Sequence, residues 1–146
     1  MKIEILEGTI EEVVELSKKI PELVNPHEKK EYQKRMTNRK HLILIAYVNG
    51  EAAGFKVGYE KYSDGSFYSW MGGVLPVYRR EGIARVLAEY QENWAKGEGY
   101  TSIRFKTRNS HQKMLLFAIS RGFQIIEVIP REQISEYRIL LERILE

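Results

Sequence analysis

The sequence contains no cysteine, which excludes a disulfide scaffold, a thiolate zinc site and a cysteine nucleophile. Its longest apolar run, residues 42–48, is far too short to cross a bilayer, so we expect no membrane partner. Residues 1–4 show no basic segment leading into an apolar one, so we expect no signal peptide and a cytoplasmic protein. Repeats, linkers and low-complexity stretches are also lacking, which favours a single domain over residues 1–146.

The sequence also lacks a large excess of either sign of charge. Lys and Arg number 23 against 20 Asp and Glu, a formal net charge of +3. Basic residues are interleaved with acidic ones instead of forming a dense stripe, so we do not expect nucleic acid as a partner. The mild excess keeps a surface soluble, but it also suits a phosphate-bearing ligand, which needs only a few cations in one place. With 43% hydrophobic residues, the chain can bury a core of its own.

Turn and capping residues divide the first half of the chain. Thr9 and Glu12 have the spacing of a capping box, which marks a helix start. Asn49 and Gly50 predict a two-residue hairpin turn, and residues 63–65 a second turn, so three strands form an antiparallel meander. The expected elements are strands at 2–7, 41–48, 51–62 and 66–75, and helices at 9–20 and 28–39.

Two features of this half bear on function. The helix at 28–39 is very polar, with mainly Tyr32 and Met36 to bury, so we expect a loosely packed surface helix that can act as a lid. Gly72 and Gly73 lie near the end of the third meander strand, where they predict a bulge or the close approach of another backbone.

The second half alternates helices and strands. Apolar residues recur at helical spacing from Ile83 to Trp94, and Gly97 and Gly99 end that helix. The expected elements are helices at 82–96 and 112–121, and strands at 102–107, 123–129 and 136–144. The predicted class is α+β, with a mixed, mostly antiparallel sheet flanked by helices in three layers.

The most informative segment is the turn that leads from the meander into the next helix. A helix start exposes unpaired N–H groups and the positive end of the helix dipole, which together bind anions. Gly82 lets a ligand approach the backbone, and Ala84 keeps the next turn small. Arg79, Arg80 and Arg85 place three cations at an end where positive charge is unfavourable unless an anion binds. The segment therefore predicts a phosphate site, and a surface loop with incidental arginines is the alternative.

This segment resembles the cofactor loop of the GNAT superfamily of acyl-CoA-dependent N-acetyltransferases. The family loop reads Gln/Arg-x-x-Gly-x-Gly/Ala, is entered by a Val-x-Pro-x-Tyr-Arg run and is followed later by Gly-Phe. The matching motifs here are Val74-x-Pro76-x-Tyr78-Arg79, Arg79-x-x-Gly82-x-Ala84 and Gly122-Phe123. The order of strands and helices also fits, so the resemblance covers nearly the whole chain and implies a GNAT-like fold.

The resemblance also implies an activity. The protein would move an acetyl group from acetyl-CoA to a primary amine by direct attack in a ternary complex, without a metal. The loop amides would bind the pyrophosphate of CoA, and the N–H of Val74 would face the thioester oxygen and stabilise its developing charge. The residues implied in CoA binding are Val74, Arg79, Arg80, Glu81, Gly82, Ile83, Ala84, Arg85, Asn109 and Phe117.

The sequence departs from the family at two catalytic positions. Many relatives carry a tyrosine that protonates the leaving thiolate, and this position is Ala118 here, with Phe117 beside it as an apolar wall. Relatives often place a glutamate or histidine base where this chain has Trp70. These departures keep open a catalytically weak or inactive CoA-binding sensor or interaction module as the alternative function.

Aromatic residues mark the expected acceptor slot. Strand alternation places Tyr68, Trp70, Gly72 and Val74 on one face, so Tyr68 and Trp70 would contact the acceptor. Tyr68 is also the candidate for proton transfer, because it is the only titratable group of the four. The alternative is a stripe of core residues. Aromatic surfaces favour an acceptor with apolar or cationic character, and we expect a small-molecule amine more than a protein.

Further polar residues have weaker roles. Arg104 and Lys106 share a strand face and would attract a carboxylate or phosphate if they turn toward the slot, but a solvated strand face is the favoured alternative. Asn109 directly follows a strand, where it can cap the next helix and meet the pantetheine of CoA, whereas the usual family spacing falls on His111. His27, Glu28 and Glu31 lack a convincing companion ligand, so we expect no metal. The sequence leaves a homodimer open.

Overall fold

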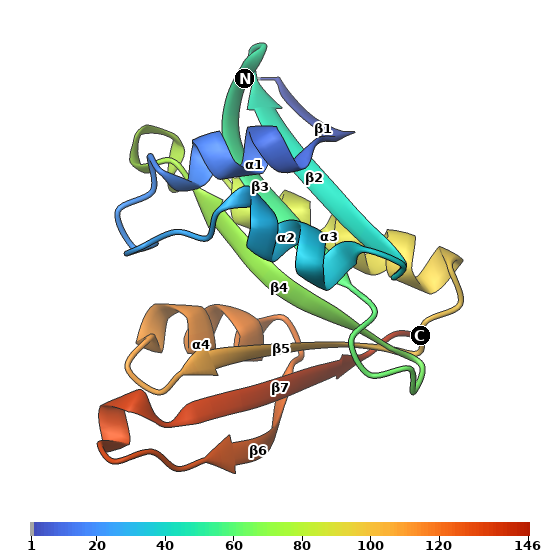
Figure 1. Cartoon of the computed structure of the whole chain (residues 1–146), viewed down its shortest axis with the longest axis vertical. Helices are drawn as coiled ribbons and strands as arrows, with labels where there is room; N and C mark the ends of the chain where they lie inside the picture. Colours follow the sequence, from blue (N-terminus) through green and yellow to red (C-terminus); the bar gives the residue numbers. More distant parts are fainter. Residues whose placement is uncertain (1) are drawn as a thin grey trace.

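A computed structural model describes residues 2–146, which form one seven-stranded sheet and four α-helices (Figure 1). The strands are β1 (Ile3–Glu7), β2 (His41–Val48), β3 (Glu51–Tyr59), β4 (Ser66–Val74), β5 (Ser102–Arg108), β6 (Gln124–Ile129) and β7 (Arg138–Ile144). The helices are α1 (Ile10–Ser17), α2 (Lys29–Met36), α3 (Ile83–Gly97) and α4 (Gln112–Ser120). Short 3₁₀ helices occupy Pro76–Tyr78 and Ile134–Glu136. Every strand and helix expected from the sequence is present, with ends shifted by up to three residues.

The strands lie in the order β1-β2-β3-β4-β5-β7-β6. The meander of β2, β3 and β4 is antiparallel, as predicted, and Asn49 and Gly50 make its first turn with positive φ at both positions. The pair of β4 with β5 is parallel, whereas the remaining neighbours are antiparallel. The prediction of a mixed, mostly antiparallel sheet is therefore confirmed.

Helices cover both faces of the sheet, with α1 and α2 in front and α3 behind in Figure 1. Under α1 and α2 the buried residues include Val13, Leu16, Tyr32, Met36, Ile45, Phe55 and Val57. Under α3 and α4 they include Leu44, Phe67, Ile83, Leu87, Ile103, Leu115, Ala118 and Leu141. Successive side chains of the apolar strand β2 point to opposite faces of the sheet, so this strand contributes residues to both cores. Three layers result, as expected.

Helix α2 differs from its prediction as a loose lid. Its Tyr32 side chain is fully buried and its Met36 side chain is 3% exposed, so both anchor the helix on the sheet. Two large apolar side chains are enough here, because the buried area of each stabilises its position by roughly 1.5–3 kcal/mol. We therefore describe α2 as a fixed part of the front layer.

Strand β4 contains a bulge at Trp70. Val57 of β3 pairs with Met71, whereas the next residue, Gly58, pairs with Ser69, so Trp70 is an extra residue without a partner. The prediction of a bulge at the two glycines is wrong in position. An extra residue in one strand shifts every later side chain by one place.

The shift divides the predicted acceptor stripe between the two faces of the sheet. Tyr68 and Trp70 pack with the residues under α1 and α2, whereas Val74 packs with the core under α3. The prediction that Tyr68, Trp70, Gly72 and Val74 share one face is therefore wrong. Gly73 instead turns to the α1 side, where an added Cβ would lie 2.8 Å from Ile20 Cδ1.

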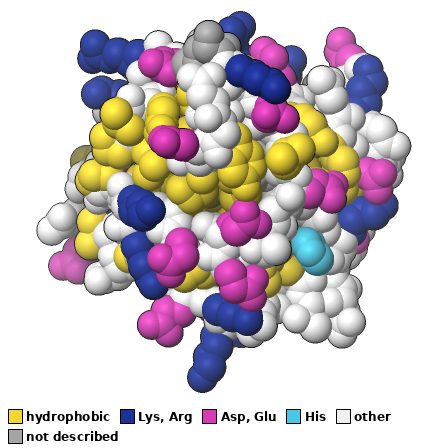
Figure 2. Space-filling view, turned by 90° about the horizontal axis from the view of Figure 1, so that it is seen from above, with side chains coloured by type: hydrophobic (Ala, Val, Ile, Leu, Met, Phe, Trp, Pro, Cys, Tyr) yellow, Lys and Arg dark blue, Asp and Glu magenta, His cyan; other side chains and the backbone are white. Residues whose placement is uncertain are grey.

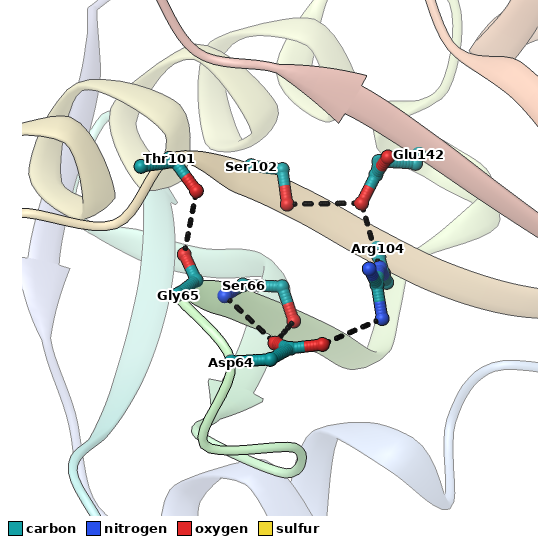
Figure 3. Close-up of polar contacts among 7 residues, drawn as sticks. All are labelled: Asp64, Gly65, Ser66, Thr101, Ser102, Arg104 and Glu142. Carbon is teal, nitrogen blue, oxygen red and sulfur yellow. Dashed lines mark hydrogen bonds and ion pairs between the residues drawn. The ribbon is translucent and has the colours of Figure 1, made fainter.

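A polar network fastens one end of β4 to β5 and β7 (Figure 3). The carboxylate of Asp64 accepts from the backbone N–H and hydroxyl of Ser66 at 3.0 and 2.5 Å. Arg104 donates to Asp64 at 3.0 Å and to Glu142 at 2.6 Å. Both carboxylates thus neutralise Arg104, which leaves it unsuited to the carboxylate-binding role considered from the sequence.

The surface seen from above carries a band of hydrophobic side chains bordered by acidic and basic ones (Figure 2). On this face the two signs of charge are interleaved, without a broad area of positive charge. Among residues 2–146, no helix is both long enough and apolar enough to cross a membrane.

Candidate functional site

Strands β4 and β5 lie side by side at only one end. Residues 66–68 pair with residues 102–104, and beyond Tyr68 the two strands diverge (Figure 1). The network around Arg104 holds the closed end of this fork. The divergence leaves the facing backbone edge of β4 available to an extended ligand, which can hydrogen-bond to it like an added strand.

The N–H of Val74 points into the fork. Leu75, the next residue, donates its N–H to the carbonyl of Ala53 on β3 at 2.8 Å. Because successive N–H groups of a strand point to opposite edges, the N–H of Val74 is directed away from β3 and toward β5. The Val74 carbonyl shares this edge and accepts from Nε of Arg79 at 3.1 Å. This is the orientation that an oxyanion donor at Val74 requires.

The turn after β4 forms a cradle of backbone N–H groups. Arg80 and Gly82 both have positive φ, at 67° and 81°, and left-handed Gly82 is followed directly by the right-handed helix α3. A left-handed residue next to a right-handed one turns consecutive N–H groups toward a common point and creates an anion-binding concavity. In the part of the chain that the structure describes, none of the N–H groups of residues 80–85 has a hydrogen-bond acceptor.

Helix α3 begins at this cradle without a capping side chain. Gly82 is its N-cap, and the first backbone bond runs from Val86 to the Gly82 carbonyl at 3.0 Å. Ile83 and Leu87 are buried in the core, so the helix end is held rigidly although its first turn is unsatisfied. A fixed helix start with free N–H groups fits a phosphate or pyrophosphate.

The arginines at this end divide into two groups. Arg80 and Arg85 are exposed beside the cradle, whereas Arg79 binds Glu22 from the loop between α1 and α2. Hydrogen bonds from Arg79 hold the pKa of the Glu22 carboxyl below its usual value. Glu22 is a site residue that the sequence reasoning missed, and it brings the front layer to the mouth of the fork.

Helix α4 lies on the α3 side and starts close to the same mouth. The positive charge of Lys113 in its first turn also lowers the pKa of Glu22. Phe117 is half-buried, whereas Ala118 is 2% exposed and faces the core. A tyrosine at position 118 would therefore point into packed side chains in this chain.

Asn109 does not cap α4, so that interpretation is wrong. Its side-chain nitrogen donates instead to the carbonyl of Ile134 at 3.3 Å, in the turn before β7. His111 is the N-cap residue, with its Nδ1 atom 3.2 Å from the Thr107 hydroxyl. Which of Asn109 and His111 meets a ligand stays a prediction.

Trp70 lies in an aromatic cluster on the front face. Its ring is 4.9 Å from the Tyr32 ring and 5.2 Å from the His27 ring, and the guanidinium of Arg35 lies 4.3 Å above it. Trp70 thus has much of the character of a core residue. Because Arg35 already covers the ring, the expectation that it attracts a cationic acceptor has no support.

Tyr68 lies deeper in the same cluster. Burial raises the pKa of its phenol to about 12, and the ammonium of Lys61 lies 4.5 Å from its ring centre. Val74 lies six positions beyond Tyr68 on β4, which is roughly 15–20 Å even with the bulge. A buried, protonated phenol at that distance cannot act on a group held at Val74.

The remaining sequence candidates are accounted for by local contacts. His27 stacks on Trp70, and Glu31 accepts a hydrogen bond from Arg35 at 2.8 Å. Within residues 2–146, no three His, Asp or Glu side chains are grouped to hold a metal ion.

Comparison of the sequence with known protein families finds one match. The sequence profile of the acetyltransferase (GNAT) family matches residues 10–123, which include α1, the fork and the cradle. The chain belongs to the GNAT acetyltransferase family. The matched segment ends at Phe123, in the Gly-Phe motif that first carried the resemblance.

Solved GNAT structures share the whole fold. Ard1 from Thermoplasma volcanium superposes with a TM-score of 0.84 and 20% identity, covering 100% of this chain and 99% of that one. The ribosomal-protein-S18-alanine N-acetyltransferase of Escherichia coli gives a TM-score of 0.83 and 17% identity, covering 99% and 95%. A GNAT acetyltransferase from Elizabethkingia anophelis with acetyl-CoA bound gives 0.78 and 20%, covering 98% of each chain. At these identities the likeness establishes the fold. A search of curated protein sequences finds no match.

Proposed function

We propose that this GNAT protein transfers an acetyl group from acetyl-CoA to a primary amine of its acceptor. The observation that carries the proposal is the row of N–H groups at residues 80–85, which have no acceptor among the described residues and surround the start of α3. The pyrophosphate of CoA supplies acceptors for several such donors at once. The exposed Arg80 and Arg85 add charge attraction.

We expect the rest of the donor to lie in the fork. The pantetheine arm would hydrogen-bond to the free edge of β4 between residues 71 and 74, as an additional strand. Phe117 of α4 would give this arm an apolar contact. These assignments rest on the divergence of β4 from β5 and on the position of α4 beside the mouth of the fork.

The chemical step needs position more than a special side chain. The unprotonated amine attacks the thioester carbon, so a C–N bond forms while the C–S bond breaks and the thiolate leaves. The N–H of Val74 donates to the carbonyl oxygen as its negative charge grows. Holding amine and thioester together supplies a further large part of the rate. The amine's proton leaves to solvent, and the CoA thiolate takes one up there.

A second candidate, a CoA-binding module without useful turnover, is favoured by one observation. Ala118 occupies the usual acid position and is buried, so helix α4 supplies no phenol there. Both candidate functions require CoA to bind at the cradle, and they differ only in whether the acetyl group is transferred to an amine.

Thiol release separates them. The protein is incubated with acetyl-CoA and a panel of amines that includes amino acids, polyamines and short peptides, and acetylated products are identified by mass spectrometry. We expect release that depends on one class of amine and exceeds slow hydrolysis of the thioester. Tight CoA binding without amine-dependent release across the panel would favour the binding module.

A further inference from the structure

Three cations gather on the front face of the sheet without a carboxylate partner. They are Arg39 after α2, Lys61 in the turn after β3, and Lys106 on β5, and we call them the cation cluster. Nearby Arg35 and Arg104 form ion pairs with Glu31, Asp64 and Glu142. Across residues 2–146, no ion pair reaches Arg39, Lys61 or Lys106.

Aromatic rings form the floor of this cluster. The ammonium of Lys61 lies 4.5 Å from the ring centre of Tyr68 and 5.4 Å from that of Tyr62. The guanidinium of Arg39 lies 5.7 Å from the ring centre of Tyr59. Contacts with aromatic faces hold a cation in place but leave its outer donors unused.

Lys106 reaches the cluster from the neighbouring strand. It alternates with Phe105, which packs under α3 and α4, so Lys106 projects from the opposite face of β5. Burial lowers the pKa of Lys61, and the charges of Lys106, Arg35 and Arg39 lower it further. Because like charges repel, the arrangement is more favourable with an anion among them.

We propose that the cation cluster binds a carboxylate of the acetyl acceptor, so that the acceptor is an extended acidic molecule. The inference rests on the proposed transfer at Val74, because that position fixes where the reacting amine must lie. Both ends are then defined along β4: the amine at the edge that Val74 presents to the mouth of the fork, and the anion on the front face beside the ring of Tyr68.

The separation of these ends sets the length of the acceptor. Tyr68 lies six residues before Val74 on β4, and Lys106 lies two positions nearer the open end on β5 than the partner of Tyr68. At about 3.3 Å for each residue, the amine and the carboxylate are roughly 10–20 Å apart. A single amino acid is too short. A peptide whose acidic side chain follows its amino terminus by three to five residues has the required reach, which differs from the small amine expected from the sequence.

The test uses hexapeptides with a free amino terminus that carry one glutamate at position 2, 3, 4, 5 or 6, and matched peptides with glutamine. We expect the KM for the glutamate peptide to be at least tenfold below that of its glutamine partner at positions 4–6, and similar at position 2. Lys61→Gln or Lys106→Gln should remove this preference, while Lys61→Arg retains it. Lys34→Gln, an exposed change of equal charge on α2, is the matched control.

Calorimetry with the same peptides, without CoA, separates the two proposals. A preference for glutamate that is lost in Lys61→Gln supports the cation cluster even if no acetyl transfer is detected, in which case the proposed function fails alone. Equal binding of glutamate and glutamine peptides by the folded wild-type protein overturns the cluster, whether or not peptides are acetylated. Loss of affinity for both peptides in Lys61→Gln would also overturn it, because the effect would then be structural.

Discussion

Arg79 holds the carboxylate of Glu22 with both terminal nitrogens, at 2.7 and 2.6 Å, across 57 residues of sequence. The Nε atom of the same side chain binds the Val74 carbonyl at 3.1 Å. One guanidinium thus joins the loop after α1 to the last residue of β4. In the proposed function an acceptor reaches Val74 past this loop, so we expect the pair to shape the entrance.

Glu22→Gln should affect the acceptor more than the donor. The pair is largely exposed, so its loss should change the free energy of unfolding by less than about 1 kcal/mol. A loosened loop should raise the acceptor KM several-fold, while the Kd for CoA is not weakened. Steady-state kinetics and calorimetry measure the two quantities. Glu15→Gln, which breaks the exposed pair with Lys18 on α1, is the control. Unchanged acceptor KM would show that the pair is irrelevant to the entrance.

The sequence predicted the order of the elements because its signals are local. The capping box of Thr9 and Glu12 forms as predicted, and Asn49-Gly50 turns between β2 and β3. The anion site at the start of α3 could also be predicted from the sequence, because Gly82 and the arginines lie within a few residues of one another. Signals of this kind depend on neighbours along the chain, so no tertiary information is needed.

Other features depend on partners distant in sequence. The bulge at Trp70 exists only in the register of β4 against β3, so alternation along β4 alone assigned Val74 to the wrong face. Asparagine is a residue type that often caps helices, but the side-chain amide of Asn109 donates instead to the Ile134 carbonyl, in the turn before β7. The link from Glu22 to Arg79 has no local pattern that could have predicted it.

Phe117→Tyr tests whether a missing acid limits turnover. Phe117 is half-buried on α4, so an added hydroxyl can reach solvent with little effect on stability. We expect kcat to change less than about threefold and its pH dependence to stay unchanged, because the CoA thiolate can leave without being protonated. A large rise in kcat with a shifted profile would mean that the hydroxyl was limiting.

The charge of Lys56, on the α3 side of the sheet, is destabilised by burial. Lys56 alternates with Phe55 and Val57, which face α1 and α2, so it projects toward α3. Burial, with a smaller contribution from the charge of Arg121, lowers the pKa of Lys56 to about 8 against the opposing effect of Glu92. The folded pKa lies below the unfolded value near 10.4. Between these values the unfolded chain binds more protons, so this group makes stability rise with pH.

Lys56→Met should therefore stabilise the protein at pH 7. We expect a gain of about 1–3 kcal/mol in the free energy of unfolding, since methionine keeps the shape and removes the buried charge. The gain should shrink at pH 10, where Lys56 is largely neutral. Urea unfolding at the two pH values measures it, with the exposed Lys34→Met as reference. A gain independent of pH would assign the effect to packing alone.

Calorimetric titration of CoA into the wild type, Gly82→Asp and Gly97→Asp tests the central claim, that the cradle at residues 80–85 binds the donor. Aspartate tolerates the left-handed conformation of Gly82 better than most residues, so the variant should fold. Position 97 lies at the other end of α3, where an added Cβ would meet no other segment of the chain within 4 Å, and the variant has the same change of charge. We predict affinity weakened tenfold or more by Gly82→Asp, since each lost charged hydrogen bond costs about 1.5–3 kcal/mol, and near wild-type affinity for Gly97→Asp. Equal affinity of folded Gly82→Asp and wild type would contradict the account.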